Sequence, residues 1–135
     1  MAPIFPSPEW LEKSKEKLNS DERYAQVAKN WEGDLLIIIE PHGDLKEQII
    51  LYWDLWHGKC RKVVYNANLA DFKPTFILKS TYDNMVSIVQ GKMDPTTAML
   101  TNKLHVKGSM GYMMRNIPTV LDFVRCALEI TKEIL

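Results

Sequence analysis

The amino-acid sequence predicts a single α+β domain in which helices cover a twisted five-stranded sheet. The first observation behind this prediction is a run of mostly β-branched residues at 35–39, which is too short for a helix. The second is the two-residue alternation of apolar side chains in the segments after it, and the third is the helical apolar period in the C-terminal half. A chain of 135 residues, 46% of them hydrophobic, has the size and composition of one domain with its own core.

Two helices are expected before the sheet. Ser7 can cap a first helix, which begins at the following proline and continues for about three turns. Ser20 is the expected cap of a second helix, because apolar residues recur from there to Trp31 at helical spacing. We therefore divide the domain into an N-terminal segment with its helix, residues 1–19, and a main part, residues 20–135.

Four strands follow, and they are predicted at residues 35–39, 46–56, 60–67 and 72–79. Short turns rich in glycine connect the first three strands, which predicts a meander. The second strand is expected to place its odd-numbered apolar residues, 49 to 55, on one face and residues 50, 52 and 56 on the other. In the fourth strand, Phe72, Phe76 and Leu78 are expected on one side.

Short helices and a last strand complete the expected fold. A capping-box pattern beginning at Ser80 predicts a helix over residues 81–90. Asp94 stands before a proline, which predicts a short helix that ends near Asn102. Polar and apolar residues alternate in the fifth expected strand, at residues 104–108.

Two further helices are expected after this strand. Ser109 is the predicted cap of a short helix in which Met110, Met113, Met114 and Ile117 share one face. Pro118 is expected to end this helix. A final helix is predicted from about residue 119 to residue 133, with a broad apolar face.

Composition excludes several classes of protein. Lysine plus arginine equals aspartate plus glutamate at 17 each, so we expect no nucleic-acid partner. The N-terminus lacks the pattern of a signal peptide, and the longest apolar run is too short for a membrane span, so we expect a soluble, cytoplasmic protein. Cys60 and Cys126 are far apart and fit neither a paired zinc spacing nor a disulfide framework, so reduced thiols are expected.

No motif for catalysis, metal binding or cofactor binding is present in the sequence. His42 and His57 fall in predicted turns, and His105 alternates with lysines on the polar side of a strand. Asp21 and Glu22 open a helix, where negative charge complements the helix dipole without any catalytic role. We therefore expect no catalytic residue, no metal ion and no cofactor.

Methionine is the unusual feature of the composition. Six of the seven methionines lie between Met85 and Met114, in the predicted helices that follow the sheet. Methionine is flexible and polarizable, and it can adapt a cavity wall to ligands of different shapes. An ordinary core filled with methionine explains the same pattern, and the sequence leaves both interpretations open.

A longer motif resembles a known family. Residues 88–95 read Ile-Val-Gln-Gly-Lys-Met-Asp-Pro, and residues 98–111 read Ala-Met-Leu-Thr-Asn-Lys-Leu-His-Val-Lys-Gly-Ser-Met-Gly. This succession resembles the signature of the sterol carrier protein type 2 family, and the resemblance covers about residues 20–135. The family usually has glycine where Asn102 stands, and asparagine is the next best residue for a positive φ.

The resemblance implies a five-stranded sheet and helices that enclose an apolar tunnel. It also implies binding or transfer of a lipid, from the fatty acid, fatty acyl-CoA, sterol or phospholipid class, without a catalytic step. The residues expected to bind the lipid are apolar and come from the sheet and the later helices: Trp53, Phe76, Met85, Val89, Met93, Met99, Met110, Met113, Met114, Ile117, Leu121, Val124 and Leu128.

Two alternatives stay open for function and assembly. A structural or regulatory interaction domain, acting with a lipid-metabolising enzyme, is the alternative to a lipid carrier. Transient contact with a membrane is expected of a carrier, and both a monomer and a homodimer remain open. We also expect the segment from Ser109 to Pro118 to act as a movable wall of the cavity, because it is too short to be a stable helix alone.

Overall fold

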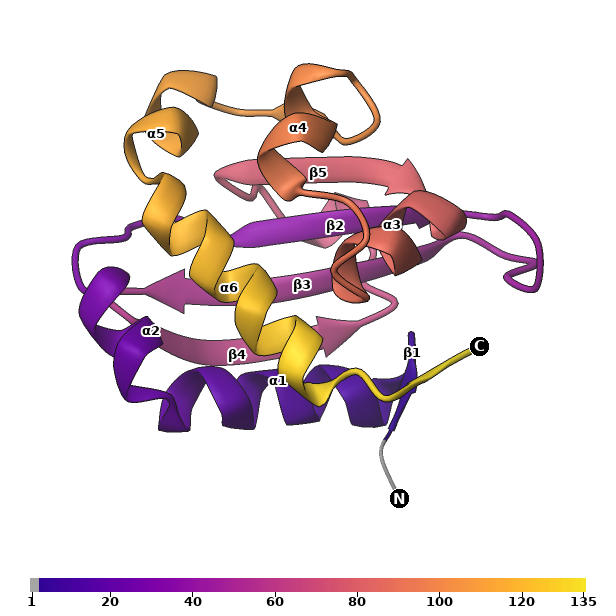
Figure 1. Cartoon of the computed structure of the whole chain (residues 1–135), viewed down its shortest axis with the longest axis horizontal. Coiled ribbons are helices and arrows are strands. Elements are labelled where there is room, and N and C mark those ends of the chain that lie inside the picture. Colours follow the sequence, from indigo (N-terminus) through magenta and orange to yellow (C-terminus); the bar gives the residue numbers. More distant parts are fainter. Residues whose placement is uncertain (1–2) are drawn as a thin grey trace.

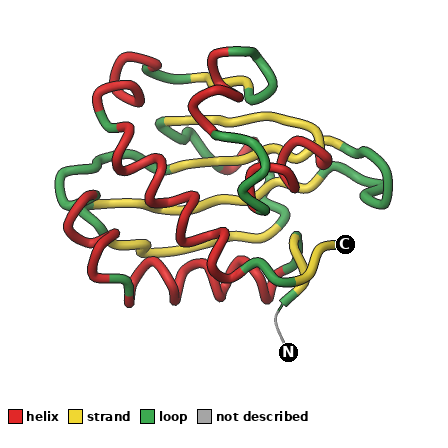
Figure 2. Tube along the Cα trace, viewed as in Figure 1, coloured by secondary structure: helices red, strands yellow, loops and turns green. Residues whose placement is uncertain are grey.

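The computed structural model describes residues 3–135 and shows a sheet with helices on one face (Figures 1 and 2). The strand order in the sheet is β4-β3-β2-β5-β6. Its strands are β2 (Leu35–Glu40), β3 (Ile49–Trp56), β4 (Lys59–Tyr65), β5 (Phe76–Thr81) and β6 (His105–Lys107). The predicted α+β fold with five strands is therefore confirmed.

The remaining elements are helices and one small second sheet. The helices are α1 (Pro8–Ser20), α2 (Glu22–Val27), the 3₁₀ turn η1 (Leu69–Asp71), α3 (Tyr82–Val89), α4 (Pro95–Leu100), α5 (Met110–Arg115) and α6 (Ile117–Ile130). The second sheet consists of β1 (Ile4–Phe5) and β7 (Glu133–Ile134), which pair in parallel near the two ends of the chain (Figure 1). No helix of the described chain is long and apolar enough to cross a membrane.

The predicted meander of β2, β3 and β4 is confirmed, and the fourth strand, β5, joins the free edge of β2. β2, β3 and β4 are antiparallel neighbours, whereas β5 is parallel to β2. The connection from β4 to β5 runs over the face of the sheet that the helices leave open, where Ala67 and Phe72 are packed. We call this the outer face, and the helix-covered face the inner face.

The two faces of β3 divide as the sequence predicts. Leu51, Trp53 and Leu55 belong to the main core between the sheet and the helices. Ile50 and Tyr52 belong to a smaller cluster on the outer face. Because both faces are buried, this strand has apolar residues at almost every position, and only their parity indicates which face each one occupies.

The prediction for Phe72 is wrong. Its ring packs on Tyr52 of the outer face, with ring centroids 4.3 Å apart, whereas Phe76 belongs to the inner core. The chain joins the sheet only at Phe76, so residues before it do not follow the two-residue alternation of a strand. The second strand likewise begins later than predicted, at Ile49.

Three predicted helix caps are confirmed. The hydroxyl groups of Ser7 and Ser109 and the carboxylate of Asp94 each accept a hydrogen bond from the backbone amide three residues later. Asn102 has a φ of 59°, so asparagine does supply the left-handed turn where the related family has glycine. Gly108 has a φ of 129°, and an added Cβ would lie 2.6 Å from the carbonyl oxygen of Thr75.

Two other predicted caps are wrong. Asp21, not Ser20, caps α2 by accepting a hydrogen bond from Tyr24, and α2 ends at Val27, well before Trp31. Ser80 is the fifth residue of β5, and its hydroxyl donates to the carbonyl oxygen of Lys103. The Ser80 hydroxyl binds a residue far along the chain, whereas the exposed Ser20 hydroxyl donates back to the carbonyl oxygen of Lys17 at 3.3 Å.

The C-terminal helices also differ from the prediction. α5 ends at Arg115, and Ile117 begins α6, with Pro118 in its first turn. Proline fits there because the first residues of a helix need no backbone donor. α6 ends at Ile130, and Glu133 is part of β7 instead of the helix.

A cluster of charges holds α6 against α1 and α2. The guanidinium group of Arg125 donates hydrogen bonds to Asp122 at 2.7 Å, to Asp21 at 2.6 Å and to Glu129 at 2.8 Å. Lys17 adds ion pairs to Asp21 at 3.2 Å and to Glu129 at 2.8 Å. Asp122 is only 3% exposed, so its charge depends on these partners.

The same cluster makes stability depend on pH. The Arg125 hydrogen bond is the main cause that holds the pKa of Asp21 below its ordinary value of 3.8. A carboxyl whose pKa is lowered in the folded protein stabilises it above the unfolded pKa, and this contribution is lost as the pH falls. The stabilisation from Asp21 is therefore complete at neutral pH and disappears progressively below about pH 4.

Replacing Arg125 should test the importance of this cluster. We expect Arg125→Ala to lower the unfolding free energy at pH 7 by about 3 kcal/mol, because Asp122 stays buried without its main partner. Lys13→Ala is the control, since its ion pair with Glu16 is exposed and 3.9 Å long, and such pairs contribute well under about 1 kcal/mol. Urea unfolding measures the free energy of both variants. Equal effects of the two substitutions would contradict the importance of the cluster, and so would an Arg125→Ala variant that loses as much stability at acidic pH as the unmodified protein.

Candidate functional site

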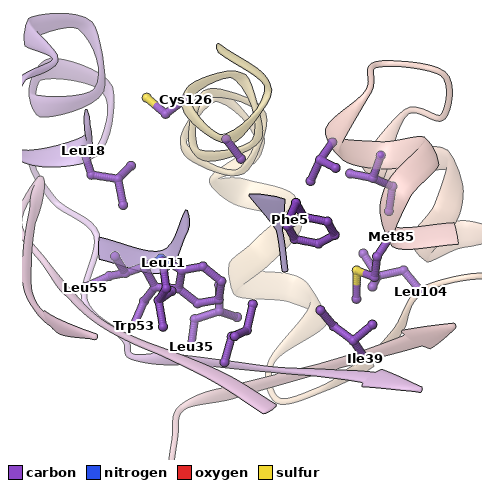
Figure 3. Packing of buried hydrophobic residues seen from close by; sticks show 14 of the residues in the cluster. Phe5, Leu11, Leu18, Leu35, Ile39, Trp53, Leu55, Met85, Leu104 and Cys126 are labelled. Atoms are coloured by element: carbon purple, nitrogen blue, oxygen red, sulfur yellow. The ribbon is translucent and has the colours of Figure 1, made fainter. Parts of the chain in front are cut away.

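An apolar cavity lies between the inner face of the sheet and the helices. It has a volume of about 100 Å³. Figure 3 shows the buried side chains that pack around this region. The walls come from β1 (Phe5), β2 (Leu35, Ile37, Ile39), β3 (Leu51, Trp53, Leu55), β5 (Leu78), α1 (Trp10), α2 (Tyr24), α3 (Met85, Ile88, Val89), α4 (Pro95, Met99), α5 (Met113) and α6 (Thr119, Val120, Phe123, Val124, Ala127), with Trp31 and Leu104 between elements.

The chemistry of this wall is almost uniform. Tyr24 and Thr119 are the only lining residues with a hydroxyl group, and no lining residue carries a charged side chain. The hydroxyl of Thr119 donates to the carbonyl oxygen of Val27 at 2.9 Å, so it is already satisfied. Burial raises the pKa of Tyr24, which therefore stays neutral. Such a wall offers contact to apolar groups and no group for acid, base or nucleophilic chemistry.

The volume limits what this conformation can hold. An engineered apolar cavity of about 150 Å³ accommodates one benzene molecule and otherwise stays dry. The cavity here is smaller, at about 100 Å³. A long apolar ligand therefore needs some of the walls to move apart.

The α5 wall is a short element with few anchors. It has six residues, and Met113 points into the core with 3% exposure. Tyr112 attaches it to the loop after α2: its hydroxyl accepts a hydrogen bond from the backbone amide of Glu32 at 3.0 Å. Its ring also packs against Trp31 and Phe76, with centroids 5.1 and 5.8 Å apart. That this wall moves remains a prediction.

The reactive side chains of the described chain lie outside the cavity. Burial raises the pKa of Cys60 to about 12 and that of Cys126 to about 11, so both thiols stay protonated at neutral pH. The described residues contain one group with the spacing of metal ligands, formed by Asp21, Asp122 and Cys126. Arg125 already binds the carboxylates of Asp21 and Asp122, so these residues form an ion-pair cluster between helices.

A family model supplies the identification. The model of the SCP-2 sterol transfer family matches residues 11–120, which is most of the sequence. This chain belongs to the SCP-2 sterol transfer family. The match includes β2 to β6 and all the residues of the motif at 88–111, so the predicted family is confirmed. No curated protein sequence matches this chain.

Solved structures of SCP-2 proteins share the fold. A crystal structure of sterol carrier protein 2 covers 93% of this chain and 98% of its own, with a TM-score of 0.84 and 22% identity. The solution structure of TT1886, described as possibly sterol carrier protein, from Thermus thermophilus covers 97% of this chain and 92% of its own, with a TM-score of 0.83 and 22% identity. Palmitated SCP2L2 from Aedes aegypti covers 85% and 94%, with a TM-score of 0.60 and 15% identity.

The structure gathers some of the predicted lipid-binding residues of this SCP-2 chain around the cavity and leaves others outside. The predicted residues that line it are Trp53, Met85, Val89, Met99, Met113 and Val124. Those that do not line it are Phe76, Met93, Met110, Met114, Ile117, Leu121 and Leu128.

The positions of the predicted residues outside the cavity have physical explanations. On α6, Leu121 and Leu128 are seven residues apart and therefore share a face, which is the exposed one, at 41% and 38%. Met110 is the first residue of α5 and is 37% exposed. Phe76 is buried, yet Trp31 and Tyr112 cover its ring. The broad apolar surface of α6 did not reveal which part of it faces the sheet.

Several lining residues were absent from the prediction. Leu35, Ile37 and Ile39 alternate on β2, and their parity could have placed them on the inner face once the orientation of that strand was known. Phe5 left no such signal, because its position depends on the pairing of the first and last strands. Trp31 also lines the cavity from a loop that was predicted to be helical.

The two neighbouring methionines of α5 should differ in their effect on stability. We expect Met113→Gln to lower the unfolding free energy by about 1–3 kcal/mol, because it buries an unpaired amide in the apolar wall. Met114→Gln should cost clearly less, because Met114 is only half-buried and does not line the cavity. Urea denaturation of the two variants measures the difference; an equal or inverted order would contradict this orientation of α5.

Proposed function

We propose that this chain binds and transfers a long-chain hydrophobic ligand of the fatty acid, fatty acyl-CoA, sterol or phospholipid class. The observation that carries the proposal is the cavity with an uncharged, apolar wall in an SCP-2 fold. One structural neighbour, SCP2L2 from Aedes aegypti, was solved in its palmitated form, which supports an acyl chain among these candidates. The proposed activity is non-enzymatic and needs no cofactor, because binding an apolar chain requires only apolar contact.

The energy of such binding is sufficient. Burying one methylene is favourable by about 0.8 kcal/mol, so a chain of about 14 methylenes gains roughly 11 kcal/mol before the costs of association. Part of this gain offsets the cost of moving the walls apart, because the empty cavity is too small for such a chain. One methylene more or less changes affinity only modestly, and broad specificity follows.

The small volume of the empty cavity favours one alternative. A domain whose cavity stays closed would act as a structural or regulatory module beside a lipid-metabolising enzyme. A native mass spectrum of freshly purified protein distinguishes the two, because a carrier retains an apolar ligand and an interaction module is bare. Bare protein that also fails to bind added lipid would favour the alternative.

Filling the cavity should weaken binding without unfolding the protein. Ile37 is half-buried on the inner face, where Ile37→Phe adds bulk to the cavity. We expect this variant to bind a fluorescent long-chain fatty acid at least tenfold more weakly, a difference of about 1.4 kcal/mol. Ile77→Phe is the matched control, because Ile77 is on a neighbouring strand and packs on the outer face.

Displacement of the probe by unlabelled lipids completes this test. Competition by fatty acid, acyl-CoA, sterol and phospholipid identifies the ligand class that binds best. Failure of the unmodified protein to bind any of them at micromolar concentration would reject the proposed function. Equal binding by Ile37→Phe and Ile77→Phe would place the ligand outside this cavity.

We further propose that transfer uses contact with an anionic membrane through α4, α5 and the strand between them. Residues 95–121 contain no aspartate or glutamate, and Lys103, Lys107 and Arg115 are exposed there. Leu100, on the same stretch, is 71% exposed, which is unusual for a large apolar side chain. Both helices lie along one edge of the molecule, next to the cavity they enclose (Figure 1).

Removal of the three cations should weaken membrane binding. Each basic residue near an anionic surface contributes about 1 kcal/mol, so replacing Lys103, Lys107 and Arg115 by serine should reduce vesicle binding about 100-fold. The control replaces Lys13, Lys29 and Lys59 by serine, with the same change of net charge at exposed sites elsewhere. Co-sedimentation with phosphatidylcholine vesicles containing phosphatidylserine measures both; equal losses would exclude this surface as the contact.

A further inference from the structure

The strand that carries Phe5, β1, lies beside the C-terminal end of α6 (Figure 1). Phe5 comes before the first helix and is only 2% exposed. It is among the residues that line the cavity, and its ring packs edge-on against Trp10 with centroids 4.7 Å apart. Figure 3 shows Phe5 pointing between the sheet, at Ile39, and the helix that carries Met85.

A small clasp made by the two ends of the chain holds Phe5 in place. We use the term terminal clasp for residues 4–5 and 133–135. Ile4 pairs with Glu133 and Phe5 pairs with Ile134 in parallel register. The amide of Leu135 donates to the carbonyl oxygen of Phe5 at 3.0 Å, and the hydroxyl of Tyr82 on α3 donates to the carbonyl oxygen of Leu135 at 2.7 Å.

The terminal clasp has few other attachments. Two strands of two residues each do not form a stable sheet by themselves. Ile4, Ile134 and Leu135 are between 40% and 47% exposed, so they bury little surface against the domain. Ends of a chain with few buried contacts open more readily than the core. Phe5 is therefore the deeply buried residue of an otherwise loosely held segment.

The sheet and α6 are fixed more firmly. The inner face of the sheet is held by the hydrogen bonds of five strands. α6 is held by the ion pairs of Arg125 with Asp21 and Asp122. Displacing Phe5 therefore breaks less structure than moving the sheet or α6.

We propose that Phe5 is a removable end wall that determines the length of ligand the cavity accepts, and that the terminal clasp opens to let it leave. This inference rests on the proposed binding of an apolar chain. A short chain fits beneath Phe5, whereas a long chain takes the place of the ring and emerges between α3 and the clasp. Both halves of the clasp lie outside residues 11–120, the part that the family model matches.

Chain-length dependence tests the end wall. Saturated fatty acids of 8 to 18 carbons compete with one fluorescent fatty acid for the unmodified protein and for Phe5→Ala. With Phe5 present, affinity should stop rising at an intermediate length, because longer chains must displace the ring. In Phe5→Ala it should continue to rise, with a gain of at least tenfold for 16 carbons relative to 8 carbons.

A matched variant separates this effect from loss of stability. Leu18 is 1% exposed in the same core and does not line the cavity, so Leu18→Ala should lower the melting temperature without changing the length profile. Phe5→Leu, a milder change, serves if Phe5→Ala does not fold, and its profile should shift in the same direction. Superimposable profiles for the unmodified protein and the Phe5 variants would overturn the inference while leaving the proposed function intact. Absence of binding by every chain length would reject the proposed function itself.

Association kinetics test the clasp. Tyr82→Phe removes the hydroxyl that binds Leu135 and keeps Phe5, so stopped-flow mixing should show faster association of a 16-carbon fatty acid, by about threefold or more. Tyr52→Phe is the control, because its hydroxyl donates to Asp34 on the outer face at 2.7 Å. Equal association rates in the two variants would overturn the proposal that the terminal clasp opens to admit the ligand.

Discussion

The position of α6 over the sheet depends on one buried charge cluster. The buried Asp122 is neutralised mainly by Arg125, with Arg23 as a second partner at 3.3 Å. The guanidinium group of Arg125 also reaches across to Asp21, the cap of α2. This contact joins residues that are 104 positions apart in the sequence. It holds the buried face of α6 above the inner face of the sheet, and the remaining helices close the space between them. The cavity exists because these two layers are held at a separation that their side chains do not completely fill.

A rigid pair of layers confines adjustment to the short elements around them. α4 and α5 have six residues each, and the terminal clasp has two residues on each strand. Helices of this length are not stable alone and depend on what they pack against. Four of the lining residues next to these elements, Met85, Met99, Met113 and Phe5, fill space that an apolar chain could occupy. Flexible methionines suit such a role, and a methionine core and a ligand-adaptable wall are therefore compatible descriptions of the same residues.

Local sequence patterns predicted most of the fold, and about half of the residues predicted to bind the lipid line the cavity. The strand at 35–39, the faces of β3 and the caps Ser7, Asp94 and Ser109 follow from contacts within a few residues. Ser80 and Phe72 were misassigned because their partners are distant in sequence. Ser20 was misassigned because its hydroxyl donates back to Lys17, and Asp21 caps α2 instead. Leu121 and Leu128 were placed in the site because α6 is apolar on more than one side, and the sequence of the helix does not show which side faces the sheet. Phe5 was missed because no local pattern indicates that the two ends of a chain will pair.

A cavity that is nearly closed when empty suits a carrier that must release its ligand. A gross gain of about 11 kcal/mol would correspond to a dissociation constant of about 10 nM, and release from such a complex is slow. When the walls and the Phe5 ring refill the space, they regain apolar contacts that the ligand had displaced. This regained contact lowers the net affinity by the free-energy difference between the open and closed protein, and it shortens the lifetime of the complex. The side chains that limit the empty volume thereby promote exchange, which a permanently open tunnel of the same apolar composition could not do.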